Sequence, residues 1–485
     1  MSMHTLKDRY EQMSIQVRAT LWFLICSFFQ RGISVITTPI FTRLLSTDEF
    51  GQFSVFSSWM AIFQVVITLN IASGMYTQGL VKHSDEKDTY ASSMQGLTIT
   101  LCSIWTVLYF LFHGFINNLI GVSTIHMLMM LCMIWATGAF NLWSIVQRVN
   151  YNYKTLVIIT LLVSFLKPIS SIILIMCMEN KVTARILGLT LAELLGYSGV
   201  CVHQLLKGKS FYSAKFWKYA VILNVPLIPH ALSQTILNSS DRIMISNIVG
   251  EGEAGIYNLA YSVSQIMIIF SVSLSQTLAP WTYEKIKKKR VEEIKSIAYV
   301  TMIFIAAVNL ILIMIAPEVI KIFAPEPYHD AIEIIPPIAM ATFFLYLYDW
   351  FARFEYYYEK SWWIMIASVT GAGLNIGLNW AFINLCGYYA AAYTTLVCYI
   401  VYTFMHYVFM HKICEKEFPG VVVYEPSILF KISIIFLIVG FALSLTYKHP
   451  IARYTLITIS TLAIIVFRKR ILSFLKNIMS LRKQN

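Results

Sequence analysis

The chain has 485 residues, of which 58% are hydrophobic and only 13% are charged, and its mean hydropathy is +0.66. A soluble core cannot absorb that much apolar surface, so this composition excludes a soluble globular protein and leaves room for roughly a dozen or more membrane spans. The net charge of +12 does not indicate nucleic-acid binding, because the basic residues lie in short loops where they set topology and contact anionic headgroups.

Apolar runs of spanning length follow one another along the whole chain. Each is close to the length of about 20 residues that a helix needs to cross a bilayer. We therefore predict an all-α, polytopic membrane protein with about fourteen transmembrane helices. The predicted spans are 19–42, 53–74, 91–113, 124–147, 155–177, 185–206, 219–248, 256–280, 297–316, 331–353, 362–385, 388–410, 428–446 and 450–467.

Basic residues determine the predicted orientation. With the N-terminus in the cytoplasm and successive spans alternating in direction, most of the 37 Lys and Arg residues fall on the cytoplasmic side, as the positive-inside rule requires. The two richest clusters on that side lie at 285–290 and 468–470. We expect a multi-pass protein with both termini in the cytoplasm.

A short internal repeat indicates two lobes. The pattern Glu-x-Gly-x-aromatic occurs at 49–53, after the first span, and again at 253–257, after the seventh. Because the flanking spans run in the same direction in both copies, we predict a parallel repeat of two six-helix lobes around a central cavity. We expect the glycine of each copy to allow a tight turn between helices. The predicted parts are an N-terminal lobe (1–206), a cytoplasmic linker (207–218), a C-terminal lobe (219–411), and two additional helices with a cytoplasmic tail (412–485).

Motifs for chemistry are absent from the sequence. The eight cysteines are scattered through apolar runs without a CxxC pair, which is typical of packing residues. The cytoplasmic loops contain no nucleophile-and-base, metal-ligand or Gly-rich nucleotide motif. We expect no enzyme activity, no catalytic residue, no metal and no cofactor.

Ionisable residues inside the spans are the candidates for function, because a charge in lipid is costly unless it is paired or faces water. Lys167 and Glu193 lie at nearly equal distances from the outer turn at Asn180. They could therefore form an ion pair between antiparallel neighbours, and this pairing is the structural alternative to a function for both. The candidates are Arg31, Lys167, Glu193, Asp241 and Arg242.

The remaining candidates differ in how they can be partnered. Arg31 has no acidic residue on its own or the next span, so its structural alternatives are backbone carbonyls or Glu193. Asp241 and Arg242 point about 100° apart on a helix, so at least one must turn toward another helix. Asp241 either binds a coupling proton or holds Arg242. If Arg31, Lys167 and Arg242 line one cavity, that cavity suits anionic cargo such as a diphosphate.

Two passages carry a resemblance to a known family. They are 43–53, Arg-Leu-Leu-Ser-Thr-Asp-Glu-Phe-Gly-Gln-Phe, and 241–245, Asp-Arg-Ile-Met-Ile, with Gly250 and the Gly-Ile-Tyr of 255–257 behind it. The chain resembles, over essentially its whole length, the polysaccharide or oligosaccharide flippases of the multidrug/oligosaccharidyl-lipid/polysaccharide exporter superfamily, which include Wzx-type O-antigen flippases.

The resemblance implies a function in polysaccharide or lipopolysaccharide biosynthesis. A polyprenyl-diphosphate-linked oligosaccharide, an O-antigen or capsule repeat unit, would cross from the cytoplasmic to the outer leaflet of the bacterial inner (plasma) membrane by alternating access. Arg31, Lys167 and Arg242 would contact the diphosphate or the saccharide, and Glu193 and Asp241 would serve coupling or charge pairing. Implied partners are the lipid-linked substrate, membrane lipids, and a polysaccharide polymerase with its chain-length regulator.

Two other functions stay open. An ion-coupled multidrug antiporter of the same superfamily needs a deep carboxylate, and Glu193 or Asp241 could serve as one. A membrane-embedded polysaccharide polymerase or glycosyltransferase is disfavoured, because such enzymes usually need a long extracytoplasmic loop and the predicted outer loops are short.

Overall fold

The computed structural model describes residues 13–481. The described residues are 89% helical and include no strand. Between residues 13 and 481, fourteen helical segments are long and apolar enough to cross a membrane. The predicted all-α polytopic class with about fourteen spans is therefore confirmed.

Contacts divide the chain into two compact units, Met1–Ser239 and Ser240–Asn485. The predicted linker 207–218 stays a prediction; it begins in α8 and ends in α9. The elements of unit 1 are α2 (Ile15–Leu44), α3 (Thr47–Ile67), α4 (Tyr76–Lys82), η1 (Ser84–Glu86), α5 (Lys87–Ile120), α6 (Thr124–Val149), α7 (Tyr153–Cys177), α8 (Lys181–Gly208), α9 (Ala214–Asn224) and η2 (Val225–Leu227).

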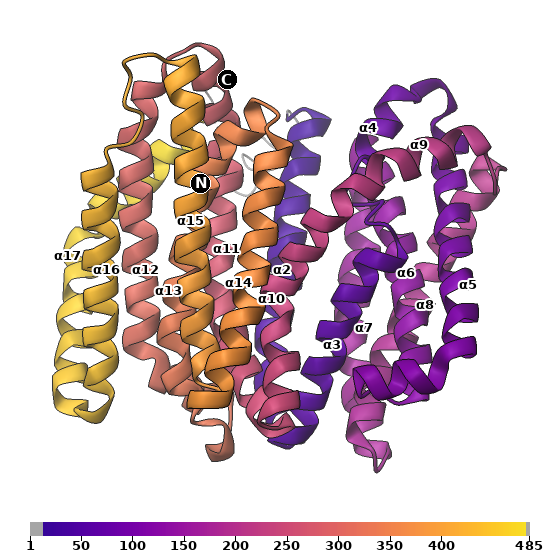
Figure 1. Ribbon diagram of the computed structural model, residues 1–485, viewed down its shortest axis with the longest axis horizontal. Helices are drawn as coiled ribbons and strands as arrows, with labels where there is room; N and C mark the ends of the chain where they lie inside the picture. The colour runs from indigo at the N-terminus through magenta and orange to yellow at the C-terminus, as the bar shows by residue number, and fades with distance from the viewer. Residues whose placement is uncertain (1–12, 482–485) are drawn as a thin grey trace, which may run out of the picture. The chain divides into compact units, whose positions relative to one another are not determined.

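Helix α10 (Ile228–Ile248) contains the division between the units. In unit 2, α13 packs extensively against α15 and α11, and α16 packs against α12 (Figure 1). The elements of unit 2 are α11 (Glu251–Lys287), η3 (Val291–Glu293), α12 (Ile294–Phe323), η4 (Glu326–Tyr328), α13 (Ala331–Tyr357), α14 (Ser361–Cys386), α15 (Ala390–Glu417), α16 (Pro426–Leu445), η5 (Thr446–Lys448) and α17 (Pro450–Leu481).

The repeated Glu-x-Gly-x-aromatic pattern marks helix starts. Ser46 and Glu49 form a capping box at the start of α3, with the Glu49 amide donating to the Ser46 hydroxyl at 3.2 Å and the Ser46 amide donating to the Glu49 carboxylate at 2.8 Å. Glu253 lies in the first turn of α11, where it complements the helix dipole. The expectation of glycine turns was wrong, because Gly51 and Gly255 are buried inside α3 and α11.

Small residues bring α7 and α8 close together in unit 1. A Cβ atom at Gly188 of α8 would lie 2.5 Å from the Cα atom of Ser171 in α7. The Ser170 hydroxyl donates to the Gly188 carbonyl at 2.8 Å. Helices in lipid associate through this kind of close packing and polar contact, since lipid tails are as apolar as leucine.

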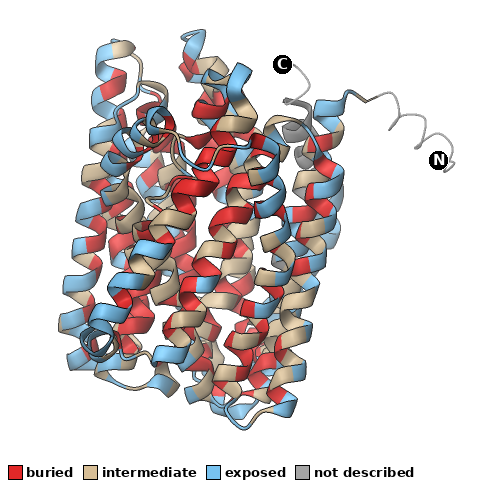
Figure 2. Ribbon diagram, turned by 90° about the vertical axis from the view of Figure 1, so that its right-hand side faces the viewer, coloured by how far each residue is buried: buried red, intermediate tan, exposed pale blue. Residues whose placement is uncertain are grey.

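The helix faces that are not packed against protein carry apolar side chains. Buried and exposed residues run along opposite faces of many helices (Figure 2). On α5, Leu111 and Phe115 are exposed, as are Ile438 and Ile451 on α16 and near the start of α17. Exposed apolar faces of this kind are stable in contact with lipid and unfavourable in water.

The α7–α8 contact yields a stability prediction. Gly188→Ala should lower the free energy of unfolding by about 1–3 kcal/mol, because the added methyl group collides with the α7 backbone. Gly199→Ala on the same helix is the matched control, since nothing lies within 4 Å of the Cβ position there. Thermal unfolding of the purified protein in detergent measures both. Equal midpoints for the two variants would contradict the close packing at Gly188.

Candidate functional site

Unit 1 contains a buried ion pair between α7 and α8. The Nζ atom of Lys167 lies 2.6 Å from Oε1 of Glu193, and the two side chains are 30% and 4% exposed. The Thr137 hydroxyl on α6 donates to Oε2 of Glu193 at 2.9 Å. The structure thus brings Lys167 and Glu193 together as the sequence allowed, and both carboxylate oxygens have partners.

A cavity of about 330 Å³ adjoins this pair and lies between α2, α3, α7 and α8. Lys167 and Arg185 contribute two cationic side chains to its lining, which includes no carboxylate. Hydroxyl, amide and apolar groups make up the rest of the wall. This mixture can hold an anion and hydrogen-bond to a polyhydroxylated ligand. The other lining residues are Gln30, Ile33, Ser34, Thr37, Thr38, Phe41, Phe53, Ser164, Pro168 and Leu189.

Arg185 is a cavity residue that sequence reasoning missed. Its guanidinium carbon lies 3.6 Å from the ring centre of Phe53, 4.2 Å from that of Phe41 and 5.1 Å from that of Phe50. Cation–π contacts of this kind fix a guanidinium in place away from water. Arg185 begins a predicted span, where basic side chains usually reach the interface, so its burial under three phenylalanines could not be inferred from its position in the sequence.

Arg31 lies within α2, but its side chain is outside the part of the chain that the structure describes. The neighbouring residues Gln30 and Ser34 line the cavity beside Lys167. A substrate contact at Arg31 therefore stays a prediction.

Asp241 is enclosed in unit 2 by neutral donors. Its Oδ2 atom accepts from the Tyr257 hydroxyl at 2.7 Å and from the Thr395 hydroxyl at 2.9 Å. Its Oδ1 atom accepts from the side-chain amides of Asn379 at 2.6 Å and Asn375 at 3.2 Å. These donors come from α11, α14 and α15, and Asp241 is only 1% exposed. Four hydrogen bonds replace the hydration of the carboxylate.

Arg242 packs against Tyr261 of α11. Its guanidinium carbon lies 4.4 Å from the centre of the Tyr261 ring, and the side chain is buried. The expectation that at least one of Asp241 and Arg242 turns toward another helix is confirmed.

Further ionisable residues in unit 2 were missed although they lie within or beside predicted spans. Arg353 pairs with Asp349 at 2.7 Å and donates to the Thr282 hydroxyl at 2.9 Å. Glu355 and His406 form a second, wholly buried pair. The sequence did indicate the Asp349–Arg353 pair, because an acidic and a basic residue four positions apart lie on one helix face.

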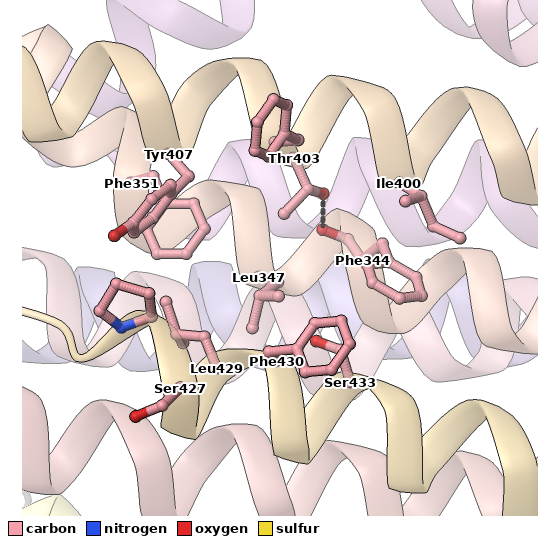
Figure 3. Close-up of a pocket in the computed structure, with 12 residues that line it drawn as sticks. Phe344, Leu347, Phe351, Ile400, Thr403, Tyr407, Ser427, Leu429, Phe430 and Ser433 are labelled. Carbon is pink, nitrogen blue, oxygen red and sulfur yellow. Dashed lines mark hydrogen bonds between the residues drawn. The ribbon is translucent and has the colours of Figure 1, made fainter.

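A second cavity, of about 530 Å³, lies between α13, α15 and α16 (Figure 3). Its wall is aromatic and aliphatic, and the residues that line it carry no charge. The Thr403 hydroxyl at this groove donates to the carbonyl of Phe344 at 2.9 Å. An uncharged wall with a satisfied hydroxyl suits a hydrocarbon chain and offers nothing to an anionic headgroup. The wall residues labelled in Figure 3 include Phe344, Leu347, Phe351, Tyr407 and Phe430.

Metal-ligand side chains do not cluster in the described part of the chain. Among those residues no group of three or more His, Cys, Asp or Glu side chains could hold a metal ion.

Comparison with known proteins gives consistent matches. Residues 17–286 match the family model described as polysaccharide biosynthesis protein, and residues 226–381 match the MatE model. An uncharacterized membrane protein of Haemophilus influenzae is 18% identical over 374 residues, which cover 73% of this chain and 87% of that protein. These matches confirm the resemblance to the multidrug/oligosaccharidyl-lipid/polysaccharide exporter superfamily.

Solved structures share the fold. The lipid II flippase MurJ in an inward closed conformation aligns with a TM-score of 0.71 at 17% identity, over 93% of this chain and 100% of that chain. An inward-facing multidrug resistance MATE family transporter of the MOP superfamily aligns with a TM-score of 0.65 at 13% identity, over 81% of this chain and 96% of that chain. At sequence identities of 17% and 13%, this structural similarity establishes that the chain shares the fold of these proteins.

The Lys167–Glu193 pair yields a double-mutant prediction. Lys167→Met should destabilise the protein more than Glu193→Gln, because it leaves the more deeply buried charge without its partner. The double variant should recover part of the loss, which gives a coupling free energy of about 1–3 kcal/mol. Thermal unfolding of the four proteins in detergent measures the cycle. Strictly additive effects would show that the contact contributes nothing to stability.

Proposed function

Because the chain belongs to the polysaccharide biosynthesis protein family, we propose that it is a flippase for a polyprenyl-diphosphate-linked oligosaccharide. The substrate, an O-antigen or capsule repeat unit, moves from the cytoplasmic to the outer leaflet of the bacterial inner membrane. The family and the fold are those of transporters and flippases, not of enzymes. The observation that carries the proposal is the cationic, hydroxyl-rich cavity of unit 1.

The chemistry of this cavity fits the headgroup of such a substrate. A diphosphate carries negative charge on oxygen atoms that accept from ammonium and guanidinium groups, here Lys167 and Arg185. Sugar hydroxyls both donate and accept, as do the hydroxyls of Ser34 and Thr38. The predicted contacts Arg31 and Arg242 remain part of the proposal as further cationic positions for the diphosphate or the saccharide.

The ion pair offers a way to couple substrate binding to proton binding. Lys167 lines the cavity and is 30% exposed, whereas Glu193 is 4% exposed and lies behind it. An arriving phosphate competes with Glu193 for the Lys167 ammonium, and the displaced carboxylate becomes costly to keep ionised in a buried place. Uptake of one proton by Glu193 removes that cost, so substrate and proton would bind together. Asp241 is the corresponding coupling candidate in unit 2.

The proposed cellular setting follows from the substrate. Both termini lie in the cytoplasm, the substrate is made on the cytoplasmic leaflet, and the translocated unit passes to a polysaccharide polymerase with its chain-length regulator.

Complementation tests the proposal. In a strain that lacks its own flippase but makes the cognate lipid-linked oligosaccharide, wild type should restore surface polysaccharide. Lys167→Met and Arg31→Ala should each reduce it about 10- to 100-fold at matched membrane abundance, since a charge-assisted hydrogen bond contributes about 1.5–3 kcal/mol. Arg31→Lys should be intermediate, because it keeps the charge and loses the planar fork.

The matched control for Lys167 is Lys154→Met on the same helix, where the lysine is exposed. Lys154→Met should behave as wild type. An equal loss in Lys154→Met and Lys167→Met would show that the effect is not specific to the cavity.

The ion-coupled multidrug antiporter is the second candidate, favoured by the buried Asp241 carboxylate and its four donors. In that case wild type should confer efflux of cationic drugs that Asp241→Asn abolishes, because the uncharged amide can neither take up a proton nor attract a cation. Drug accumulation in cells expressing either protein measures this. Efflux together with failed complementation would replace the flippase by the antiporter.

A further inference from the structure

Unit 2 contains an ionisable pair that the proposed substrate and coupling sites do not use. Nδ1 of His406, on α15, lies 2.6 Å from Oε1 of Glu355, on α13. Both side chains are 0% exposed. The rings of Tyr402 and Tyr348 flank the imidazole, with centroids 4.5 Å and 5.2 Å away. The pair therefore sits in an aromatic pocket between two helices that pack extensively against each other.

Each member of the pair has one polar atom without a hydrogen-bond partner among the described residues. These atoms are Oε2 of Glu355 and Nε2 of His406. A buried polar atom in this state costs free energy, so native proteins satisfy nearly all such atoms. The proton count of the pair decides how large this cost is.

The charge of the pair depends on a single proton. When the imidazole is neutral, its Nδ1–H group donates to an ionised Glu355, and the buried pair carries one net negative charge. One more proton makes the pair neutral overall, which removes the cost of burying an uncompensated charge. Arg353 lies nearby in the sequence, but Asp349 already pairs with it at 2.7 Å. Burial and proton uptake therefore favour each other.

Glu355 lies near the end of α13, whereas His406 lies inside α15 (Ala390–Glu417). Glu355 is two residues before the end of α13 at Tyr357, which is about 3 Å along the helix axis. Most of the titratable groups that pack in this region are tyrosines, whose ordinary pKa of about 10 keeps them neutral at physiological pH. The titratable and charged groups of this region are Tyr348, Asp349, Arg353 and Tyr356 on α13, Tyr283 on α11, Tyr402 and Tyr407 on α15, and Tyr424 before α16.

We propose that Glu355 and His406 form a proton-binding site of unit 2 that takes up one proton when the α13–α15 contact closes over it and releases that proton when the contact opens to water. Because linkage is reciprocal, the proton stabilises the closed contact by the same free energy that closure adds to proton binding. A role of this proton in transport rests on the proposed function, whereas proton binding itself does not.

Nitrogen NMR of the full chain in lipid nanodiscs, with its ten histidines labelled with nitrogen-15, tests the site without any substrate. The His406 ring should change its protonation state within the pH range in which the protein stays folded, and Glu355→Gln should alter that change because it removes the carboxylate that faces Nδ1. The ring signal is identified by its loss in His406→Gln or, should that variant not fold, by labelling the His406-Tyr407 step, the one His-Tyr sequence in the chain.

The matched control lies on the same helix. His411 and Glu415 form an exposed pair at 3.3 Å, so Glu415→Gln should leave the His406 titration unchanged. A His406 ring that keeps one protonation state over the whole range overturns the proposal, as does a midpoint that Glu355→Gln does not move. Both results leave the flippase proposal intact, because that proposal depends on complementation through the unit 1 cavity.

Discussion

The cost of a charge in lipid is the constraint on which the rest of this structure depends. Three buried ionisable groups each have a specific kind of partner: an ammonium for Glu193, neutral donors for Asp241, and aromatic faces for Arg185. A group kept at that cost inside a transporter is a candidate for function. The partners also differ in what can displace them. A competing anion can bind the Lys167 ammonium in place of Glu193. The aromatic rings around Arg185, in contrast, hold its guanidinium in place.

The two units use different chemistry within one all-helical design. Unit 1 places cationic side chains and hydroxyls around a cavity. Unit 2 encloses a carboxylate in amides and hydroxyls and encloses a histidine with a glutamate. Groups of the first kind suit an anionic, sugar-bearing ligand, and groups of the second kind suit the binding of small cations or protons.

Sequence reasoning predicted the class and number of helices because hydropathy depends only on which residues occur in each run. It also anticipated the Lys167–Glu193 pair, since equal distance from a turn places two residues of adjacent helices at one depth. It could not identify Arg185 as a cavity residue, because depth does not reveal the direction in which a side chain points. The expected glycine turns were wrong for a different reason: the repeated pattern lies at the helix start, but Ser46 and Glu49 cap α3 and Gly51 lies inside the helix.

The location of the Lys167–Glu193 pair on consecutive helices has a consequence for how the protein is made. Helices α7 and α8 are joined by a short connection. Between this connection and the ion pair, the Ser170 hydroxyl donates to the Gly188 carbonyl and links the two helices. A ribosome-bound chain can therefore deliver the two segments to the bilayer as one hairpin, in which the lysine meets its glutamate before either faces hydrocarbon alone. The Lys167–Glu193 contact beside the cavity thereby also lowers the free-energy cost of inserting these two charged segments into the bilayer during synthesis.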